Sequence, residues 1–237
     1  MGIDMHSSAD SGAAGDPHTG PGRPPAPADP ARLAAYARLL SSWPGLVSGD
    51  PGPLVEDCLV LLPHLGDAVT LVDVGSGGGM PGLPLKLARP DLRVTLVEAD
   101  RRRAAFLVHA AARLGVDVDV VPERAEAAGR GHLRERFDVA TCRALAALPV
   151  VAELCLPLVR VGGRLLAMRA GAEDTAIAAG AAALLGGGPL RVHPAPSRAR
   201  ERGLVVEVAK LAPTPAAYPR RPGIPNKRPL GGSPRNL

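Results

Sequence analysis

The sequence predicts an α/β fold with a Rossmann-like, doubly wound sheet, and three observations support this prediction. Apolar runs of strand length alternate with helical patterns along most of the chain. A glycine-rich turn, the glycine loop at 75–82, follows the first of these runs. The last two runs, 190–193 and 204–211, are joined by a loop without a helix, so we expect them to form an antiparallel terminal hairpin.

Two short helices are expected before the sheet. Apolar residues recur at helical spacing over 33–43, ending before Pro44, and the pattern returns over 54–62 after Pro53. Residues 1–30 are rich in Gly, Pro, Ala, Ser and Asp and contain almost nothing to bury, so we expect a disordered leader there. The remaining segments are assigned as an N-terminal helical segment (31–66), a main domain (67–212) and a basic, proline-rich tail (213–237).

The main domain contains five predicted strands before the hairpin: 68–74, 93–97, 116–121, 137–142 and 164–168. The helices expected between and after them are 83–88, 101–114, 146–159 and 174–185. Strands this apolar suit a sheet that is covered on both faces, and right-handed crossovers restrict its topology. A parallel sheet that ends in an antiparallel hairpin favours the class I S-adenosylmethionine-dependent methyltransferase fold over a dinucleotide-binding Rossmann domain.

The glycine loop predicts a cofactor site. Glycines at 75, 77 and 79 lack the Cβ atoms that would keep a ligand away from the main chain, and Asp73 places a carboxylate at the tip of the first strand. Together with Met80, the loop could hold the methionine moiety of S-adenosylmethionine. A dinucleotide remains an alternative, but Pro81 removes a backbone donor that a pyrophosphate would use.

Three further loops follow the next strands, and the carboxyl ends of parallel strands meet at one edge of a sheet. Glu98 is expected to accept hydrogen bonds from the ribose hydroxyls, Ala125 and Glu126 to lie against adenine, and Arg143 to complete the cofactor site. Each feature also has a structural interpretation, because glycine turns serve close packing and carboxylates cap helices. Their placement after successive strands favours the cofactor.

Composition and charge restrict the environment and the partners. The chain has a net charge of +5, and residues 198–237 hold nine Lys or Arg against two Glu, which indicates either a polyanion-binding end or a solvated tail. Three scattered cysteines predict no disulfide framework and no metal site, and they favour a reducing cytoplasm. No apolar run is long enough to cross a membrane.

The chain resembles the bacterial ribosomal RNA small subunit methyltransferase G family, also called glucose-inhibited division protein B. The resemblance rests on five segments: VDVGSGGGMPGLPL at 72–85, RRAAFL at 102–107, RAE at 124–126, CRA at 142–144 and YPRRPGIPNKRPL at 218–230. It covers roughly residues 68–230. The extension beyond the glycine turn and the closing segment are more specific than a glycine turn alone.

The resemblance implies methyl transfer from S-adenosylmethionine to N7 of one guanine in 16S ribosomal RNA, free or within the small subunit. It places the family's cofactor contacts at Gly75, Met80, Ala125, Glu126 and Arg143. Guanine N7 carries an unprotonated lone pair, so no general base is required and no catalytic residue is expected beyond positioning groups, with Arg169 as one candidate.

Seven cations are expected to meet RNA phosphates: Arg102, Arg103, Arg169, Arg220, Arg221, Lys227 and Arg228. Two departures from the family pattern accompany the resemblance. The chain has Arg169-Ala170 where the family usually has Lys-Gly, and no Arg-His pair is found in the N-terminal helices. The alternatives are a methyltransferase of the same fold with another substrate and a non-catalytic RNA-binding paralogue.

Overall fold

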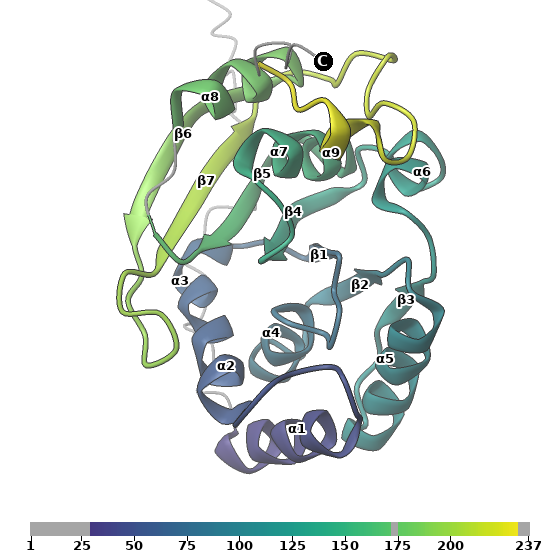
Figure 1. Cartoon of the computed structure of the whole chain (residues 1–237), viewed down its shortest axis with the longest axis vertical. Helices are drawn as coiled ribbons and strands as arrows, with labels where there is room; N and C mark the ends of the chain where they lie inside the picture. The colour runs from purple at the N-terminus through teal and green to yellow at the C-terminus, as the bar shows by residue number, and fades with distance from the viewer. Residues whose placement is uncertain (1–28, 172–174, 232–237) are drawn as a thin grey trace, which may run out of the picture.

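Figure 1 shows the computed structural model of the chain, which describes residues 29–171 and 175–231. The predicted leader at 1–30 therefore lies almost entirely outside the described residues. So do Asp174, the first residue of one predicted helix, and the last six residues of the predicted tail.

One mixed sheet of seven strands forms the centre of the described structure, in the order β3-β2-β1-β4-β5-β7-β6. The strands are β1 (Thr70–Val74), β2 (Arg93–Val97), β3 (Asp119–Val121), β4 (Phe137–Arg143), β5 (Val159–Arg169), β6 (Gly187–Pro194) and β7 (Leu204–Lys210). The first five strands pair in parallel, whereas β7 is antiparallel to both β5 and β6. The predicted terminal hairpin is confirmed. The strand order reverses between β1 and β4, which is where such sheets bind ligands.

The helices alternate with the strands as βα units require. They are α1 (Pro30–Ser42), α2 (Gly52–Asp57), α3 (Leu62–Leu65), α4 (Gly82–Ala88), α5 (Arg101–Leu114), α6 (Ala125–Arg130), α7 (Leu148–Cys155), α8 (Thr175–Leu184) and α9 (Ile224–Lys227), with 3₁₀ turns at Cys58–Leu61 and Leu156–Leu158. Local chemistry sets some of these bounds. Asp100 caps α5 by accepting a hydrogen bond from the Arg103 amide, and Gly115 ends α5 in a left-handed conformation.

Two hydrophobic cores lie on opposite faces of the sheet. Helices α1 to α5 lie below the sheet in Figure 1, and α7, α8 and α9 lie above it. The lower core includes Tyr36, Leu83 and Phe106, so the N-terminal helices share their apolar contacts with the sheet. The upper core includes Val151 of α7 and Leu230 near the chain end. Leu230 is therefore packed against the fold, and the interpretation of the tail as solvated is wrong for this residue.

Several predicted boundaries differ from the structure, including the start of β5, which lies at Val159 rather than at 164. The helix expected at 146–159 ends at Cys155, because Pro157 cannot continue an α-helix and Val159 already belongs to β5. The third strand is shorter than expected, since only Asp119–Val121 pairs with β2. The segment after β3 was expected as a loop, but Ala125 begins the six-residue helix α6.

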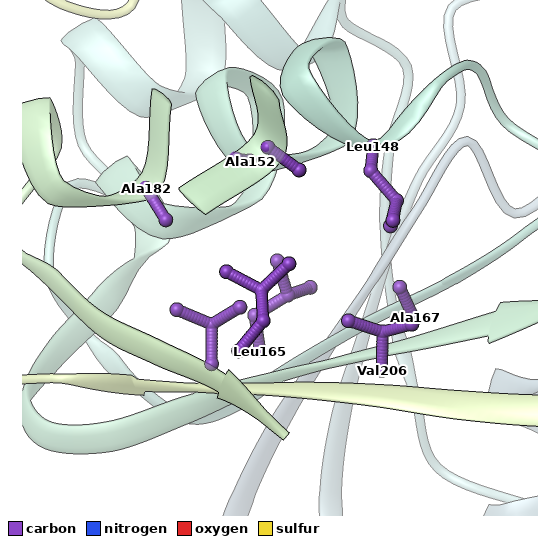
Figure 2. Close-up of a pocket in the computed structure, with 9 residues that line it drawn as sticks. Leu148, Ala152, Leu165, Ala167, Ala182 and Val206 are labelled. Atoms are coloured by element: carbon purple, nitrogen blue, oxygen red, sulfur yellow. The ribbon is translucent and has the colours of Figure 1, made fainter. Parts of the chain in front are cut away.

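A small apolar cavity lies between the upper helices and the sheet. Figure 2 shows Leu148, Ala152 and Ala182 of the helices facing Leu165 and other sheet residues across it. Its volume is about 10 Å³, at the lower limit of what one water needs, and its lining contains only Leu, Ala and Val. With no polar group to hold a water or a ligand, it is a packing gap that small alanine side chains leave.

Within the described part of the chain, no helix combines the length and the apolar character that a membrane crossing needs.

Candidate cofactor site and nucleic-acid surface

The glycine loop is packed against Leu145 at Gly75 and leaves open space at Gly77. Gly75, Gly77 and Gly79 all have positive φ values, of 69°, 57° and 95°. A Cβ added at Gly75 would come within 2.5 Å of a Leu145 methyl group, whereas at Gly77 the nearest atom would be 3.9 Å away. Space is therefore left beside Gly77, where a ligand can approach the main chain.

Glu98 connects the end of β2 to the glycine loop. Its Oε2 accepts a hydrogen bond of 2.8 Å from the Gly77 amide, and its Oε1 accepts one of 2.8 Å from the Asp100 amide. The Glu98 side chain is almost fully buried. The structure thus gives Glu98 a bracing role that the sequence did not predict, and its contact with a ribose stays a prediction.

Asp73 lies beneath the glycine loop. Its side chain is fully buried, and its Oδ2 accepts a hydrogen bond of 2.9 Å from the Gly82 amide at the start of α4. Burial raises the pKa of Asp73 to about 7, while the Gly82 hydrogen bond opposes this shift. Among the described residues, Oδ1 has no hydrogen-bond partner. Asp73 therefore shapes the loop from below and offers one unused acceptor.

Arg143 lies against Met80 of the glycine loop. The Arg143 Nη1 atom is 3.3 Å from the Met80 sulfur and 3.4 Å from the Leu54 carbonyl oxygen of α2. Its Nε atom is 3.9 Å from the buried carboxylate of Asp57. The sequence analysis did not identify Asp57, whose carboxylate also forms an ion pair of 2.7 Å with Arg200.

Tyr36 was also missed, because helical spacing marked it only as a core residue. It is fully buried, and its hydroxyl donates a hydrogen bond of 2.5 Å to the Gly78 carbonyl oxygen. Burial raises its pKa well above the ordinary value. Helix α1 therefore supports the glycine loop directly.

Ala125 and Glu126 form the first turn of α6, after the carboxyl end of β3. Ala125 is half-buried, but the Glu126 side chain is buried and its Oε1 accepts a hydrogen bond of 2.8 Å from the Gly223 amide. The Glu126 carboxylate thus faces the chain end, 97 residues later. Because Oε1 already accepts this hydrogen bond, a contact with adenine would involve other atoms of Glu126.

The chain end from 218 to 230, the C-terminal strap, runs past α6 and α7 (Figure 1). The Arg220 guanidinium donates two hydrogen bonds, of 2.8 and 2.6 Å, to the fully buried carboxylate of Glu153 in α7. The Arg220 amide donates a third, of 2.8 Å. Arg220 is predicted to meet RNA; in the structure its cation pairs with a buried carboxylate, and a contact with RNA stays a prediction.

The remaining predicted RNA contacts differ in exposure. Arg169 is half-buried, and its Nη1 donates a hydrogen bond of 2.7 Å to the Ala146 carbonyl oxygen. The exposed cations are Arg102 and Arg103 at the start of α5 and Arg221, Lys227 and Arg228 on the strap. These five side chains are accessible to a polyanion.

Three potential metal ligands lie together beside β6 and β7, at the opposite edge of the sheet from β3. The sequence predicts no metal site. Ligand atoms of His64, His193 and Glu207 lie within 4.8 Å of one another. His193 Nε2 is 2.9 Å from a Glu207 oxygen, and the nearby Arg164 helps to lower the pKa of His64, after burial and His193. The positive charge of Arg164 beside these residues opposes metal binding, so we assign the group no role.

The described site matches a family known from sequence. The family model described as rRNA small subunit methyltransferase G matches residues 52–192, which include the glycine loop, Glu98, Ala125, Glu126 and Arg143. The chain belongs to this family. The resemblance that the sequence motifs indicated is therefore confirmed.

Curated relatives extend the match over most of the chain. A protein named ribosomal RNA small subunit methyltransferase G from Roseiflexus castenholzii is 49% identical over 164 residues, 68% of this chain and 70% of the relative. One of the same name from Staphylococcus aureus is 43% identical over 216 residues, 84% of this chain and 89% of the relative.

Solved structures support the fold. An O-methyltransferase from Bacillus cereus in complex with SAH has a TM-score of 0.54 and 15% identity, covering 76% of this chain and 91% of that chain. The S-adenosylmethionine-dependent methyltransferase SibL in its apo form has a TM-score of 0.56 and 17% identity, covering 75% and 62%. The predicted class I methyltransferase fold is confirmed.

Proposed function

We propose that this protein transfers a methyl group to N7 of one guanine in 16S ribosomal RNA, free or within the small ribosomal subunit, in the cytoplasm. The coarser part of this statement follows from its family and fold: the chain is an S-adenosylmethionine-dependent rRNA methyltransferase. One observation carries the location of the site. The bare glycine loop, Glu98, Met80 and Arg143 converge where the strand order reverses.

The residues at this edge fit the cofactor. S-adenosylmethionine supplies an electrophilic methyl group. The space beside Gly77 admits a ligand to the backbone, and the unused Asp73 Oδ1 could accept a hydrogen bond from an ammonium group. Glu98 holds the Gly77 amide in place, so the cofactor would meet a loop that is already shaped.

The protein's contribution to catalysis is positioning. Guanine N7 needs no deprotonation, so the residues around the glycine loop have only to align the lone pair with the methyl carbon and the sulfur. Alignment of this kind can supply about 7–11 kcal/mol. Asp73 and Arg143, held by the Gly82 amide and by Met80 and Leu54, provide a rigid base for it.

Exposed cations provide the substrate surface. Arg102 and Arg103 follow β2, and Arg221, Lys227 and Arg228 project from the strap, so a structured RNA could contact both groups. Because such contacts recognise phosphates, base selection would depend on RNA shape and on hydrogen bonds near the cofactor.

The test is methyl transfer from radiolabelled S-adenosylmethionine to small ribosomal subunits and to free 16S RNA from a strain that lacks the modification. Wild type should label at least one of them, and Arg221→Glu should raise KM with little change in kcat. Unlabelled RNA with intact cofactor binding would favour a different substrate. RNA binding without any affinity for S-adenosylmethionine would favour the non-catalytic alternative.

A further inference from the structure

We propose that the C-terminal strap positions helix α6 for the cofactor, and that its adjacent residues Arg220 and Arg221 have different roles. Arg220 is a positioning residue that holds the adenine-facing loop, whereas Arg221 faces RNA. This inference rests on the proposed function, because it takes Ala125 and Glu126 as the adenine side of the cofactor site.

Helix α6 is too short to fix its own position. It has six residues, and it follows the three-residue strand β3 at the edge of the sheet. Helices of this length gain little stability from their own hydrogen bonds, so tertiary contacts must hold them. The start of α6 is also the loop to which the cofactor prediction assigns Ala125 and Glu126.

The strap contacts α6 at both ends. At the first turn, the Gly223 amide donates a hydrogen bond of 2.8 Å to the buried Glu126 carboxylate. At the last turn, Arg134 Nη1 donates to the Gly129 carbonyl at 3.1 Å and to the Tyr218 carbonyl at 2.8 Å, and so links helix to strap. Both ends of α6 are therefore tied to the same thirteen-residue segment, 218–230.

Glu153 anchors the strap between these two contacts. Its fully buried carboxylate accepts hydrogen bonds from the Arg220 amide, Nε and Nη2, and Arg220 Nη2 also donates 2.6 Å to the Arg228 carbonyl oxygen. A bidentate guanidinium pair of this kind fixes orientation as well as distance. Removing Arg220 would leave a buried carboxylate unpaired and free the segment that holds Glu126.

The outward side of the strap carries different residues. Arg221, Lys227 and Arg228 are exposed, and none of their guanidinium or ammonium groups donates a hydrogen bond that the described structure records. Arg220 and Arg221 are adjacent in sequence, but Arg220 pairs with Glu153 whereas the Arg221 side chain is exposed. The sequence alone presents these two arginines as one basic motif. In the structure Arg220 anchors the strap to Glu153, and Arg221 faces solvent.

The test is calorimetric titration of the full chain with S-adenosylmethionine at a temperature where each variant is folded. Arg220→Ala should weaken binding by roughly tenfold or more. Arg221→Ala, the matched control, should bind like wild type and lose only RNA affinity. Hydrogen exchange should be faster at the α6 amides in Arg220→Ala and unchanged in Arg221→Ala.

A second control separates positioning from general destabilisation. Arg160→Ala breaks an ion pair of 2.6 Å with Asp138 near the start of β4, away from the glycine loop. It should leave S-adenosylmethionine affinity unchanged, and an equal loss there would overturn the proposal. If Arg220→Ala does not fold, Arg220→Lys takes its place, since it keeps the charge but loses the bidentate geometry.

The outcomes distinguish the two levels of inference. Binding by wild type with unchanged affinity in the folded Arg220 variant would overturn the strap proposal and leave the proposed function intact. An absence of S-adenosylmethionine binding in wild type would overturn the proposed function and, with it, this inference.

Discussion

The glycine loop and the C-terminal strap both support the cofactor edge of the sheet, but different kinds of contact hold them. The glycine loop is shaped by its own backbone and by two carboxylates, one in β1 and one directly after β2, all within 26 residues from Asp73 to Glu98. The strap is held by Glu126 and Glu153, which precede their partners by 97 and 67 residues. Contacts between residues close in sequence hold the first region, and contacts between distant residues hold the second.

The glycine loop should respond most strongly to a single substitution. Gly75→Asp forces a residue with a side chain into φ 69° and against Leu145. Left-handed strain and the steric clash together predict a loss of about 3 kcal/mol in cofactor binding, roughly 100-fold in Kd. Calorimetric titration measures this loss.

Gly115→Asp is the matched control. Gly115 has nearly the same φ, 61°, but nothing lies within 4 Å of an added Cβ, and it ends α5 outside the glycine loop. Its substitution should lower stability by about 1–2 kcal/mol and leave cofactor affinity unchanged. Equal binding losses in the two variants would mean that the shape of the glycine loop is not what binds the cofactor.

The strap should show the cost of breaking a buried charge pair. Arg220→Ala leaves Glu153 without its cation and should lower the free energy of unfolding by about 3 kcal/mol. Arg160→Ala breaks a more exposed pair of the same length, 2.6 Å, and should cost less than about 1 kcal/mol. Urea unfolding of both variants gives the comparison, and similar costs would contradict the assignment of Arg220 as an anchor.

Tyr36 tests whether helix α1 fixes the glycine loop. Tyr36→Phe keeps the ring in the lower core but leaves the buried Gly78 carbonyl without its donor. We expect a stability loss of about 1–3 kcal/mol and a smaller loss of cofactor affinity. A variant as stable as wild type would show that α1 packs against the loop without fixing it.

Asp73 should show its effect as a pH dependence of stability. Its folded pKa, about 7, is raised above the ordinary 3.8, so the folded state retains a proton that the unfolded chain releases. The resulting stabilisation is complete below about pH 4 and is lost as pH rises towards 7. Unfolding measured across this range should show less of this decline in Asp73→Asn, and an identical profile would contradict the assignment.

The same comparison explains what the sequence could predict. The strands, the terminal hairpin and the glycine loop follow from local patterns, because apolar alternation and glycine conformation are properties of short segments. Glu98 could be predicted because the length of one βα unit sets its distance in sequence from the glycine loop. The ends of α7 and β3 were misplaced by a few residues, since apolar runs do not show where pairing starts.

Contacts between distant residues could not be predicted. Asp57 lies 143 residues before Arg200, and no pattern in a single sequence marks them as partners. The sequence predicts Arg220 as an exposed phosphate ligand. Charge patterning shows the sign of a side chain's charge, but not whether that side chain faces solvent or the protein interior. The pairing of Arg220 with the buried carboxylate of Glu153 in α7 is visible only in the structure.

The central claim, methylation of guanine N7 in ribosomal RNA, is tested most directly by mass spectrometry of nucleosides. Small ribosomal subunits that lack the modification would be incubated with the protein and S-adenosylmethionine, and their 16S RNA digested. We predict one 7-methylguanosine per 16S RNA molecule, and much less with Gly75→Asp at the same S-adenosylmethionine concentration. Ribosomal RNA without 7-methylguanosine, from a protein that binds the cofactor, would contradict the claim.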